Sequence, residues 1–577
     1  MAEKMQDAMP QGEMPDLETM VKMANWQSLK NGEKIFRELQ QDCEHPREVQ
    51  EELLFKLLRD NADTPFGREH GFDQIKTVED YKRQVPFTTF DDYAGLVYEV
   101  METGAAGVIC KDPIVHFNET SGTMGNPKGI PFTEAATKLM MDYGNDYSMY
   151  LIGLKYGDLL SSGRKFSMTE CRLNTTKGGT TFGAMSSRGV WNYRSILPLM
   201  TTSPDPAVFS TNDTDTRYLH ARSLLAERNL LYGTTVFVSL YLDLMRYIMD
   251  NWQMLVDDIE SGQINPDVQL PEEARKKLEE LYVPMPERAA VLRRIFEIDS
   301  EEPIMQRIWP NFRIIHSVAG AGFAPYMERM RKYSGDASVL YIGYSASEGI
   351  FSVPEKLDSP ESILVPRAAY FEFLPLSEDG EEATETVGLE DLEPGHDYEV
   401  IVTTLSGFYR YKMRDAIRCV GRHGKAPKME FLYRLDQTIN MKGEKCTEMV
   451  LRKAAQRVAD RLGLDMVDFS CYPNLAEQPP RYEMLYEFYR MPEGKVTMEE
   501  LSRVTDEEIC AGCAVYGYLR EKDGLAPAKA LLLQEETNQL WRDMRVMKGA
   551  APNQIKPVHI IDNEQKRRFF YALIERD

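Results

Sequence analysis

The spacing of apolar residues predicts helices near the start of the chain. Residues 17–41 and 49–59 place apolar side chains three and four positions apart, with charged residues between them, which is typical of an amphipathic helix. The stretch NADTPFGREHGF then interrupts the pattern with a proline and two glycines and predicts a loop. Residues 166–233 alternate short β-prone pieces with Gly- and Ser-rich turns, and helical patterns return at residues 240–259 and 272–296.

The pattern changes to strand, helix and strand after residue 312. The segments FRIIHSV and VLYIGY are β-prone, and between them lie a Gly-rich turn and the helical segment PYMERMRKYS. This alternation predicts an α/β sheet with right-handed crossover helices. Residues 369–420 are rich in strands separated by acidic turns, so a β-rich part follows the α/β part.

Another change of pattern near residue 434 predicts a second domain. Amphipathic helical patterns at 448–462 and 530–547 flank a pair of strands near 466–472 and 481–489. A small α+β domain fits this arrangement.

The predicted fold class is therefore α/β, with a large N-terminal α/β body that includes a β-rich subdomain and a small C-terminal α+β domain. We place the large domain at residues 1–433, the small domain at residues 437–577 and the junction between them at residues 433–436.

Charge and composition exclude several classes of protein. Apolar residues make up 43% of the 577 residues and charged residues 28%, as in a packed globular protein rather than a disordered one. The 68 basic and 91 acidic residues give a net charge of −23, which repels nucleic acids and anionic lipid surfaces. We therefore expect no nucleic-acid and no membrane partner. The sequence contains no uncharged apolar run of about 18 residues, so we also expect no membrane span.

Cysteine usage and the N-terminal segment indicate a cytoplasmic protein. The eight cysteines have no regular spacing, which is typical of free thiols in a reducing compartment. Cys510 and Cys513 form one Cys-x-x-Cys pair, but no second pair or histidine follows at finger spacing, so we expect no zinc site. The segment MAEKMQDAMPQGEMPD lacks the order of charges and apolar residues of a signal peptide. We expect a cytoplasmic monomer.

The first candidate site is the segment FNETSGTMGNPKGIPFT, at residues 117–133. It combines hydroxyls, a glycine that lets backbone amides approach a ligand, and a positive charge: Thr120, Ser121, Thr123, Gly122 and Lys128. Consecutive amides in such a loop form an anion nest, which hydroxyls and a lysine complete as a cradle for a triphosphate. The alternative is an ordinary Gly- and Ser-rich turn between strands.

The second candidate site is VLYIGYSASEGIF, at residues 339–351. A strand would deliver Tyr344, Ser345, Ser347 and Glu348 to its carboxyl end, where α/β sheets bind ligands. There the tyrosine could stack on an aromatic base, and the glutamate could hold a Mg²⁺ that bridges phosphate oxygens. In the alternative interpretation the tyrosine belongs to the core and the glutamate is a solvated turn residue.

The third candidate site surrounds Asp415, which follows the basic stretch YRYKMR. A carboxylate there could accept both hydroxyls of a ribose. Alternatively, Asp415 pairs with Arg410 or Arg414 on the surface, where such a pair adds almost nothing to stability.

The order of these three signals resembles that of the adenylate-forming superfamily, which includes acyl-CoA synthetases, luciferases and peptide-synthetase adenylation domains. The first segment is similar to the superfamily's Thr-Ser-Gly-Thr-Thr-Gly-x-Pro-Lys-Gly loop, with Met124 in place of the last threonine. Within it, the chain resembles most closely the auxin-conjugating amido synthetases of the Gretchen Hagen 3 family. This closer resemblance rests on TPFGREHGF, VEDYKRQVPFTTFDDY, IWPNFRIIHSVAGAGFAPYMERM before YSASEG, YFEFLPL, YEVIVTTLSGFYRYKMRD and NQIKP, and spans residues 61–558.

Three departures from the family pattern stand out. The family's Tyr-Arg-x-Gly-Asp is here Tyr-Lys-Met-Arg-Asp, so Arg414 replaces a glycine. The TSGTMGNPK segment has one residue fewer than the loop of plant members, and His559 stands where plant members have an arginine.

The resemblance implies that the protein joins a small carboxylic acid to an amine in two steps, with ATP and Mg²⁺, and the expected amine is an amino acid. It also implies that the small C-terminal domain is mobile about a hinge at residues 433–436. The acid would first form an acyl adenylate and pyrophosphate, and the amine would then displace AMP to give an amide. The implied ATP-binding residues are Thr120, Ser121, Gly122, Thr123, Tyr344, Ser345, Ser347, Asp415 and Arg434; the catalytic residues are Lys128 and Lys556; Glu348 holds the metal; and the acyl pocket comprises Ser317, Ala319, Gly320, Gly322 and Phe323.

Two alternative functions share part of this interpretation. An acyl-CoA ligase would carry out the same first step and then use the thiol of CoA in place of the amine. A catalytically silent nucleotide-binding or scaffold protein would need none of the chemistry, and the joint presence of Lys128, Glu348, Asp415 and Lys556 argues against it. For Lys556 itself the alternative is a lysine at the end of a helix whose stem covers apolar surface.

Overall fold

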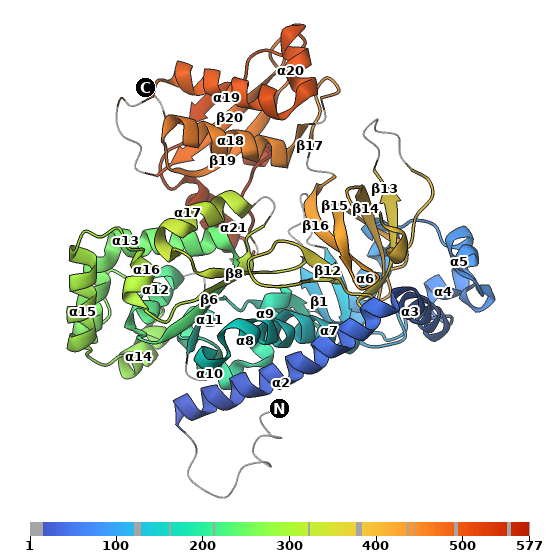
Figure 1. Cartoon of the computed structure of the whole chain (residues 1–577), viewed down its shortest axis with the longest axis horizontal. Coiled ribbons are helices and arrows are strands. Elements are labelled where there is room, and N and C mark those ends of the chain that lie inside the picture. Colours follow the sequence, from blue (N-terminus) through green and yellow to red (C-terminus); the bar gives the residue numbers. More distant parts are fainter. Residues whose placement is uncertain are drawn as a thin grey trace, which may run out of the picture. The chain divides into compact units, whose positions relative to one another are not determined.

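A computed structural model of the chain describes residues 16–119, 128–160, 163–211, 214–320, 323–376, 383–435, 438–444, 446–489, 494, 496–550 and 555–575. The chain divides into two compact units (Figure 1). The N-terminal unit comprises Met1–Met413 and Ile417–Glu430, and the C-terminal unit comprises Arg414–Ala416 and Phe431–Asp577.

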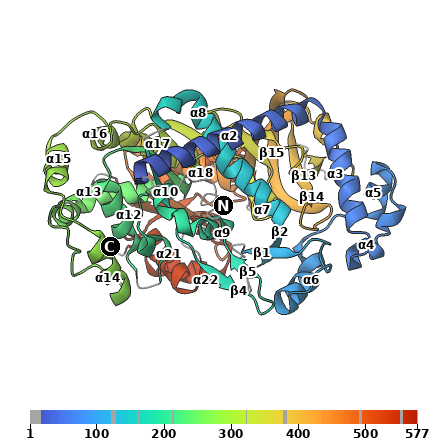
Figure 2. The same ribbon diagram turned by 90° about the horizontal axis from the view of Figure 1, so that it is seen from below.

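Helices form the start of the N-terminal unit. They are α2 (Leu17–Glu44), α3 (Pro46–Asp60), α4 (Pro65–Glu69), η1 (Phe72–Gln74), α5 (Val78–Gln84) and α6 (Phe90–Thr103). The apolar spacing predicted α2 and α3, whereas α4 lies in the stretch predicted as a loop, where Pro65 starts a short helix. The side chain of Asp16 caps α2 by accepting a hydrogen bond from the backbone amide of Thr19. The long α2 lies along α8 (Tyr147–Leu160), as both views show (Figure 1, Figure 2).

The N-terminal unit contains a parallel four-stranded sheet. Its strands are β3 (Arg164–Met168), β6 (Leu230–Phe237), β7 (Ile314–Val318) and β8 (Ser338–Tyr341), in that order. The predicted strand, helix and strand after residue 312 are β7, α17 (Ala324–Ser334) and β8. Because the strands are parallel, the residues that follow them meet at one edge of the sheet.

Between β6 and β7 the chain forms α13 (Val238–Ser261), α14 (Glu272–Leu281), α15 (Pro286–Glu297) and α16 (Ile304–Ile308). The helix predicted over 272–296 is thus two helices, because Pro286 starts a new helix and Pro284 in the connection has no amide to donate. Phe166, Tyr241 and Trp309 are completely buried in the core of this part.

The stretch 166–233 is more helical than predicted. It contains α9 (Met185–Asn192), η3 (Arg194–Ile196), α10 (Leu197–Met200), α11 (Asp205–Val208) and α12 (Thr216–Ala226). Helix α12 is buried from Tyr218 to Leu225, polar residues included. A helix that is buried on all sides has no polar face, so it lacks the amphipathic period on which the prediction depended.

A small mixed sheet has the strand order β2-β1-β5-β4. Its strands are β1 (Ile114–Glu119), β2 (Gly129–Thr133), β4 (Leu173–Thr175) and β5 (Thr181–Gly183). β1 is antiparallel to β2 and parallel to β5. Helix α7 (Glu134–Met141) and the π-helical η2 (Asp142–Asp146) continue from β2 into α8.

The β-rich part predicted over 369–420 belongs to a six-stranded sheet with the order β11-β12-β16-β15-β14-β13. The strands are β11 (Ser352–Pro354), β12 (Ser362–Leu364), β13 (Ala369–Pro375), β14 (Asp397–Thr404), β15 (Tyr411–His423) and β16 (Ala426–Arg434). The short η5 (Leu389–Asp391) precedes β14, and the hairpin of β9 (Ser345–Ala346) and β10 (Gly349–Ile350) precedes β11.

The C-terminal unit is built on a three-stranded sheet with the order β19-β20-β21. β19 (Met466–Asn474) and β20 (Arg481–Phe488) are the predicted strand pair, and α18 (Glu448–Leu462) is the predicted helix. The helix predicted over 530–547 begins only at Thr537, as α21 (Thr537–Met547), because Lys529–Leu532 forms β21 beside β20. The pattern did not identify α19 (Met498–Gly512), α20 (Ala514–Glu521), α22 (Glu564–Ala572) or the short pair β17 (Thr438–Ile439) and β18 (Cys446–Thr447).

The two faces of this sheet bury separate cores. Alternate residues of β20, Tyr482, Met484 and Tyr486, belong to the core that includes residues of α18 and α19. Leu485, which points to the opposite face, belongs to the core that includes Trp541 of α21 and Phe570 of α22. Within the described ranges of both units, we find no helix with the length and apolar character needed to cross a membrane.

Candidate functional site

The predicted phosphate loop connects β1 to β2. Thr120, Ser121, Gly122 and Thr123 lie outside the described residues, but the strands on either side fix where the loop starts and ends. Glu119 faces Gly129 across the antiparallel pair, and all of β2 is buried. The loop is therefore held at both ends by strands of one sheet.

Lys128 stands just before β2 and is exposed. Its Nζ lies 5.1 Å from the centroid of the Phe90 ring, at the start of α6. A cation over a ring face is attracted to it by roughly 0.5–1 kcal/mol at an exposed site. The contact gives the lysine a preferred position at the end of the loop and leaves it accessible to solvent.

Asn118 is a functional candidate that the sequence analysis missed. It is 6% exposed, and its amide joins three elements that are far apart in the sequence. Its Nδ2 donates to the backbone oxygen of Ser347 over 3.0 Å, and its Oδ1 accepts from the amide of Met185, the first residue of α9, over 2.9 Å. It thereby binds the end of β1, next to the phosphate loop, to the turn that carries Glu348. The asparagine in FNETSGT could have been noticed as a polar residue at the end of a strand, but an asparagine in an exposed loop would have the same sequence context.

The β9–β10 hairpin follows β8 and carries the second group of candidates. Tyr344 is 6% exposed, and the centroid of its ring lies 5.4 Å from that of Phe351. Its amide donates to Oγ of Ser352 over 2.7 Å, and its carbonyl accepts from the amide of Phe351 over 2.8 Å. In this structure Tyr344 is thus a core residue, while Ser345 beside it is exposed. The role of the tyrosine toward adenine stays a prediction.

Glu348 and Ser347 form the turn of this hairpin, and both are half-buried. Three-residue clusters of His, Cys, Asp or Glu suited to a metal do not occur among the described residues. Mg²⁺ in ATP-dependent enzymes is usually held by one or two carboxylates, by substrate phosphates and by water. A single glutamate on a turn beside the end of β1 is compatible with such a site.

Asp415 lies in β15 and is 2% exposed. Its Oδ1 accepts a hydrogen bond from Nε of Arg434 over 3.0 Å. The carboxylate is therefore buried, not on the surface, and Arg434 at the end of β16 is its partner. The guanidinium of Arg410 is instead bound by the buried Glu372, with Nε–Oε2 and Nη2–Oε1 distances of 3.0 and 2.9 Å.

Arg414, directly before Asp415, has a φ of 57°. This is the left-handed region, which costs an L-residue with a long side chain roughly 1–2 kcal/mol and costs glycine almost nothing. The conformation explains why a pattern with glycine at this position suits the strand. This chain adopts the left-handed conformation with an arginine.

The described acyl-pocket candidates lie at the end of β7 or after it, at the carboxyl edge of the parallel sheet. Ser317 is fully buried, and its Oγ lies 3.2 Å from Oγ1 of Thr235 in β6. Ala319 is also buried, and a Cβ at Gly320 would touch the ring of Tyr341 at 3.5 Å. The structure thus brings the acyl candidates and the end of β8 to one edge, where α/β sheets bind ligands.

Phe323 precedes α17, and its ring stacks on that of Phe237 at the end of β6, with centroids 4.9 Å apart and planes at 11°. This aromatic pair provides an apolar wall at the same edge. Gly322 lies outside the described residues.

Lys556 is an exposed residue of the C-terminal unit, between the buried Ile555 and Val558. The segment after it runs beside β19 and not at the end of a helix. The amide of Cys471 donates to the carbonyl of His559 over 2.8 Å, and the amide of Ile561 donates to the carbonyl of Cys471 over 2.9 Å. The lysine therefore projects from a strand-like segment that is hydrogen-bonded to the sheet.

Family models match three consecutive parts of the chain. They are the GH3 family N-terminal domain at residues 35–339, the GH3 family central domain at 362–434 and the GH3 family C-terminal domain at 447–565.

Curated relatives match along most of their length. An indole-3-acetic acid-amido synthetase of Oryza sativa subsp. indica is 26% identical over 88% of this chain and 87% of its own. A jasmonoyl–L-amino acid synthetase of Nicotiana attenuata is 24% identical over 91% and 92%. A 4-substituted benzoates-glutamate ligase of Arabidopsis thaliana is 26% identical over 91% and 94%.

Solved structures share the fold. An acyl acid amido synthetase named GH3.15 superposes with a TM-score of 0.81 at 23% identity, covering 94% of this chain and 96% of its own. A 2-hydroxyisobutyryl-CoA ligase in the postadenylation state has a TM-score of 0.53 at 12% identity, with 92% of each chain covered. The adenylate-forming fold expected from the resemblance is thereby confirmed.

Proposed function

This chain belongs to the GH3 family, and we propose that it is an ATP-dependent acyl-acid amido synthetase that conjugates a small carboxylic acid to an amino acid. The observation that carries the proposal is the presence of all three family domains in order over residues 35–565. The curated relatives cited above are amido synthetases or an amino acid ligase, and they match the chain over about nine-tenths of its length.

The chemistry solves the problem that a carboxylate is a poor acyl donor. In the first step a carboxylate oxygen attacks the α-phosphorus of ATP, and pyrophosphate leaves with the electron pair of the broken P–O bond. In the second step the amine attacks the acyl carbon, AMP leaves with the former carboxylate oxygen, and the amine loses a proton. The first step brings a negatively charged carboxylate to a negatively charged triphosphate, and the second step requires the amine to be placed at the acyl carbon. Positioning and charge neutralisation therefore supply most of the catalysis.

We assign the ATP-binding roles to the two segments at the ends of β1 and β8 and to the Asp415–Arg434 pair. The loop after β1 would bind the phosphates through its amides and hydroxyls, with Lys128 as the adjacent charge. Tyr344, Ser345 and Ser347 would face the adenine end of the nucleotide, and Asp415 would bind the ribose. Ser317, Ala319, Gly320, Gly322 and Phe323 would line the acyl pocket.

We assign Mg²⁺ to Glu348. When bound, the ion would neutralise phosphate charge during attack by the carboxylate. The hydrogen bond from Asn118 to Ser347, the residue before Glu348, would hold this carboxylate beside the phosphate loop.

The experiment is product analysis with the full-length protein, ATP and Mg²⁺ over a panel of acids. Indole-3-acetate, jasmonate and 4-substituted benzoates are the first members of the panel, because they occur in the names of the relatives. We expect AMP and pyrophosphate with the preferred acid, and an amide of that acid when a mixture of amino acids is added. The variant Lys556→Ala is the matched control for contaminating ligases.

Other outcomes identify the alternatives. A thioester formed with CoA in place of an amide would identify an acyl-CoA ligase, and ADP with phosphate would exclude adenylation. ATP binding without turnover on any acid would indicate a catalytically silent protein. We also propose that the protein is a monomer, and size-exclusion chromatography with light scattering on the same sample tests this.

A further inference from the structure

The backbone of the segment that follows Lys556 is hydrogen-bonded to β19. Besides the two backbone hydrogen bonds with Cys471, Oγ of the buried Ser470 donates to the carbonyl of Val558 over 2.5 Å. Val558 and Ile561 belong to the core formed with Trp541 and Phe570. The backbone on the C-terminal side of Lys556 is therefore fixed, although the lysine itself is exposed.

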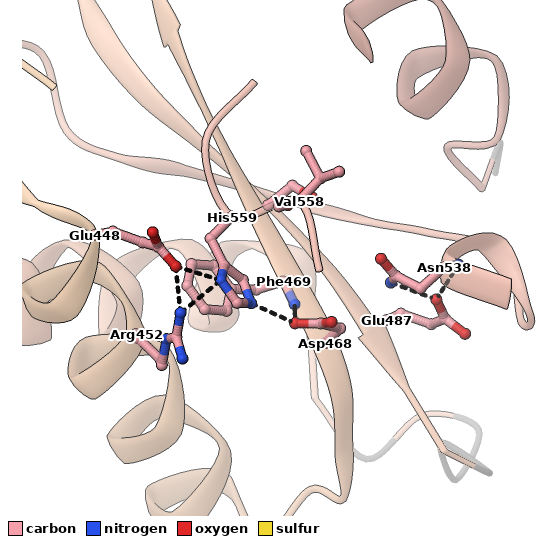
Figure 3. Close-up of polar contacts among 9 residues, drawn as sticks. Glu448, Arg452, Asp468, Phe469, Glu487, Asn538, Val558 and His559 are labelled. Carbon is pink, nitrogen blue, oxygen red and sulfur yellow. Dashed lines mark hydrogen bonds and ion pairs between the residues drawn. The ribbon is translucent and has the colours of Figure 1, made fainter. Parts of the chain in front are cut away.

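His559, three residues after Lys556, is 4% exposed and has both ring nitrogens beside carboxylates (Figure 3). Nδ1 lies 2.6 Å from Oε1 of Glu448, the first residue of α18. Nε2 lies 2.9 Å from Oδ1 of Asp468 in β19. The ring also stacks on Phe469, with centroids 4.6 Å apart and planes at 16°.

Arg452, one turn after Glu448 in α18, completes the cluster. Its Nη2 lies 2.8 Å from Nδ1 of His559 and contacts Oε1 of Glu448 (Figure 3). A carboxylate accepts hydrogen bonds and cannot donate them when it is ionised. The contacts of both ring nitrogens with carboxylate oxygens are therefore satisfied when the imidazole is protonated on both nitrogens.

A second buried carboxylate, that of Glu487, lies beside Asp468 on the sheet and is bonded to Asn538. Glu487 of β20 lies opposite Asp468 in the antiparallel register and is 3% exposed. Its Oε2 accepts from the backbone amide and from Nδ2 of Asn538, in the first turn of α21, over 2.8 and 2.6 Å (Figure 3). Oδ1 of Asp468, which lies beside Nε2 of His559, also accepts a hydrogen bond from the backbone amide of Phe469 over 2.9 Å.

We propose that His559 is the positioning residue of Lys556: as an imidazolium clamped between Glu448 and Asp468, it fixes the segment from which the lysine is presented to the α-phosphate. This inference rests on the proposed function, because it assigns a role in the adenylation step. His559 does not touch the substrate. It acts by holding the backbone three residues away, and a displacement of about 1 Å in such a group can cost roughly a hundredfold in rate.

The first test measures the attachment without any substrate. Hydrogen exchange of the full-length protein is compared for the wild type, His559→Gln and the double variant His559→Gln/Asp468→Asn, which removes one charge of each sign. We expect residues 555–561 to exchange at least about tenfold faster in the single variant, since the clamp is lost, and to recover partly in the double variant. Unchanged exchange in His559→Gln would overturn the proposal.

The control for a general loss of stability is Asp506→Asn. Asp506 lies in the same unit and binds Nε of Arg520 and the amide of Ala528 over 3.0 and 2.8 Å, but it is not part of the His559 cluster. We expect this variant to speed exchange in α19 and α20 and to leave residues 555–561 protected. Faster exchange of residues 555–561 in Asp506→Asn, equal to that in His559→Gln, would mean that His559 has no special role.

The second test separates the two half-reactions, with the best acid of the panel above. We expect His559→Gln to lower acyl-adenylate formation by about 10- to 100-fold, while amide formation from supplied acyl-AMP stays within about threefold of the wild type. The variant His559→Gln/Lys556→Ala should be no slower than Lys556→Ala alone, because the two changes remove one function.

Three results would overturn the inference. They are a wild-type rate of acyl-adenylate formation in His559→Gln, an equal loss of rate in both half-reactions, and a rate loss in His559→Gln/Lys556→Ala equal to the product of the losses in the two single variants. Failure of the proposed function is recognised separately, because wild-type protein would then form no acyl-AMP from any acid. The exchange experiment still decides in that case whether His559 holds the segment.

Discussion

Nε of Arg434 donates a hydrogen bond to Oδ1 of Asp415 over 3.0 Å, and the two residues are separated by 19 positions along the β15–β16 hairpin. The carboxylate is buried, whereas the arginine side chain is 43% exposed. A ribose that uses both carboxylate oxygens must therefore share Oδ1 with this guanidinium or displace it. The two residues are expected to act on ATP binding as a pair.

We expect Asp415→Ala to raise the KM for ATP by about ten- to a hundredfold with a smaller effect on kcat. A charge-assisted contact is worth roughly 1.5–3 kcal/mol, and the ribose is far from the reacting atoms. Steady-state kinetics over a range of ATP concentrations measures the change.

The control is Arg434→Ala combined with Asp415→Ala. If the residues act as a pair, the double variant should bind ATP about as weakly as Asp415→Ala alone. An unchanged KM in Asp415→Ala would show that the pair is purely structural.

Lys556→Ala should slow acyl-adenylate formation by about 10²–10³-fold, the usual cost of removing a preorganised charge at a reacting phosphate. Amide formation from synthetic acyl-AMP should be largely preserved, because the amine attacks the acyl carbon after pyrophosphate has left. Parallel assays with ATP and with acyl-AMP measure the two steps. An equal loss of rate in both assays would show that Lys556 has a structural role in the C-terminal unit.

Arg414→Gly should be more stable than Arg414→Ala by about 0.5–1 kcal/mol. Both variants remove the side chain, but only glycine relieves the left-handed backbone at φ 57°, and its greater flexibility in the unfolded chain offsets part of the gain. Urea unfolding of the two variants under the same conditions measures the difference. Equal stability would mean that the backbone relaxes without cost when the side chain is shortened.

Glu348→Gln should raise the Mg²⁺ concentration needed for half-maximal activity by about tenfold, because a neutral amide is a much weaker ligand for a hard cation. A Mg²⁺ titration at fixed ATP measures the shift. Glu102→Gln is the control, since Glu102 is an exposed carboxylate that pairs with Lys177. The same shift in both variants would show that Glu348 does not bind the metal.

The pH dependence of stability should reflect the His559 cluster. Burial and Arg452 lower the pKa of His559, but the carboxylates of Asp468 and Glu448 outweigh them, so its pKa is raised above 6.5. Burial raises the pKa of Glu448, but His559 and Arg452 outweigh it and hold this pKa well below 4.5.

Because the pKa of His559 is raised in the folded state, its protonation stabilises the fold fully below pH 6.5, and this contribution is lost as the pH rises through the folded-state pKa. Because the pKa of Glu448 is lowered in the folded state, its ionisation stabilises the fold fully above pH 4.5, and this contribution is lost as the pH falls through the folded-state pKa. The cluster should therefore contribute most between about pH 4.5 and 6.5. Urea unfolding of the wild type and of His559→Gln at several pH values gives the difference in unfolding free energy. A difference that does not shrink at higher pH would contradict a protonated His559.

The sequence by itself determined the local elements and the order of the chemical groups. Apolar spacing predicted α2, α3, α18 and the succession of β7, α17 and β8, because an element with one buried face carries its period in the sequence. It could not predict α12, which is buried on all sides, or separate β21 from α21, where a short strand directly precedes a helix.

The tertiary structure alone decided which side chains meet. Asn118 and Ser347 are 229 positions apart, and His559 is 111 positions from Glu448 and 91 from Asp468. Sequence periodicity reports which face of an element is buried, but the partner of a buried polar group depends on strand register and on how distant elements pack. Asp415 could therefore be identified from its surroundings in the sequence as a candidate, whereas its burial and its pairing with Arg434 follow only from the fold.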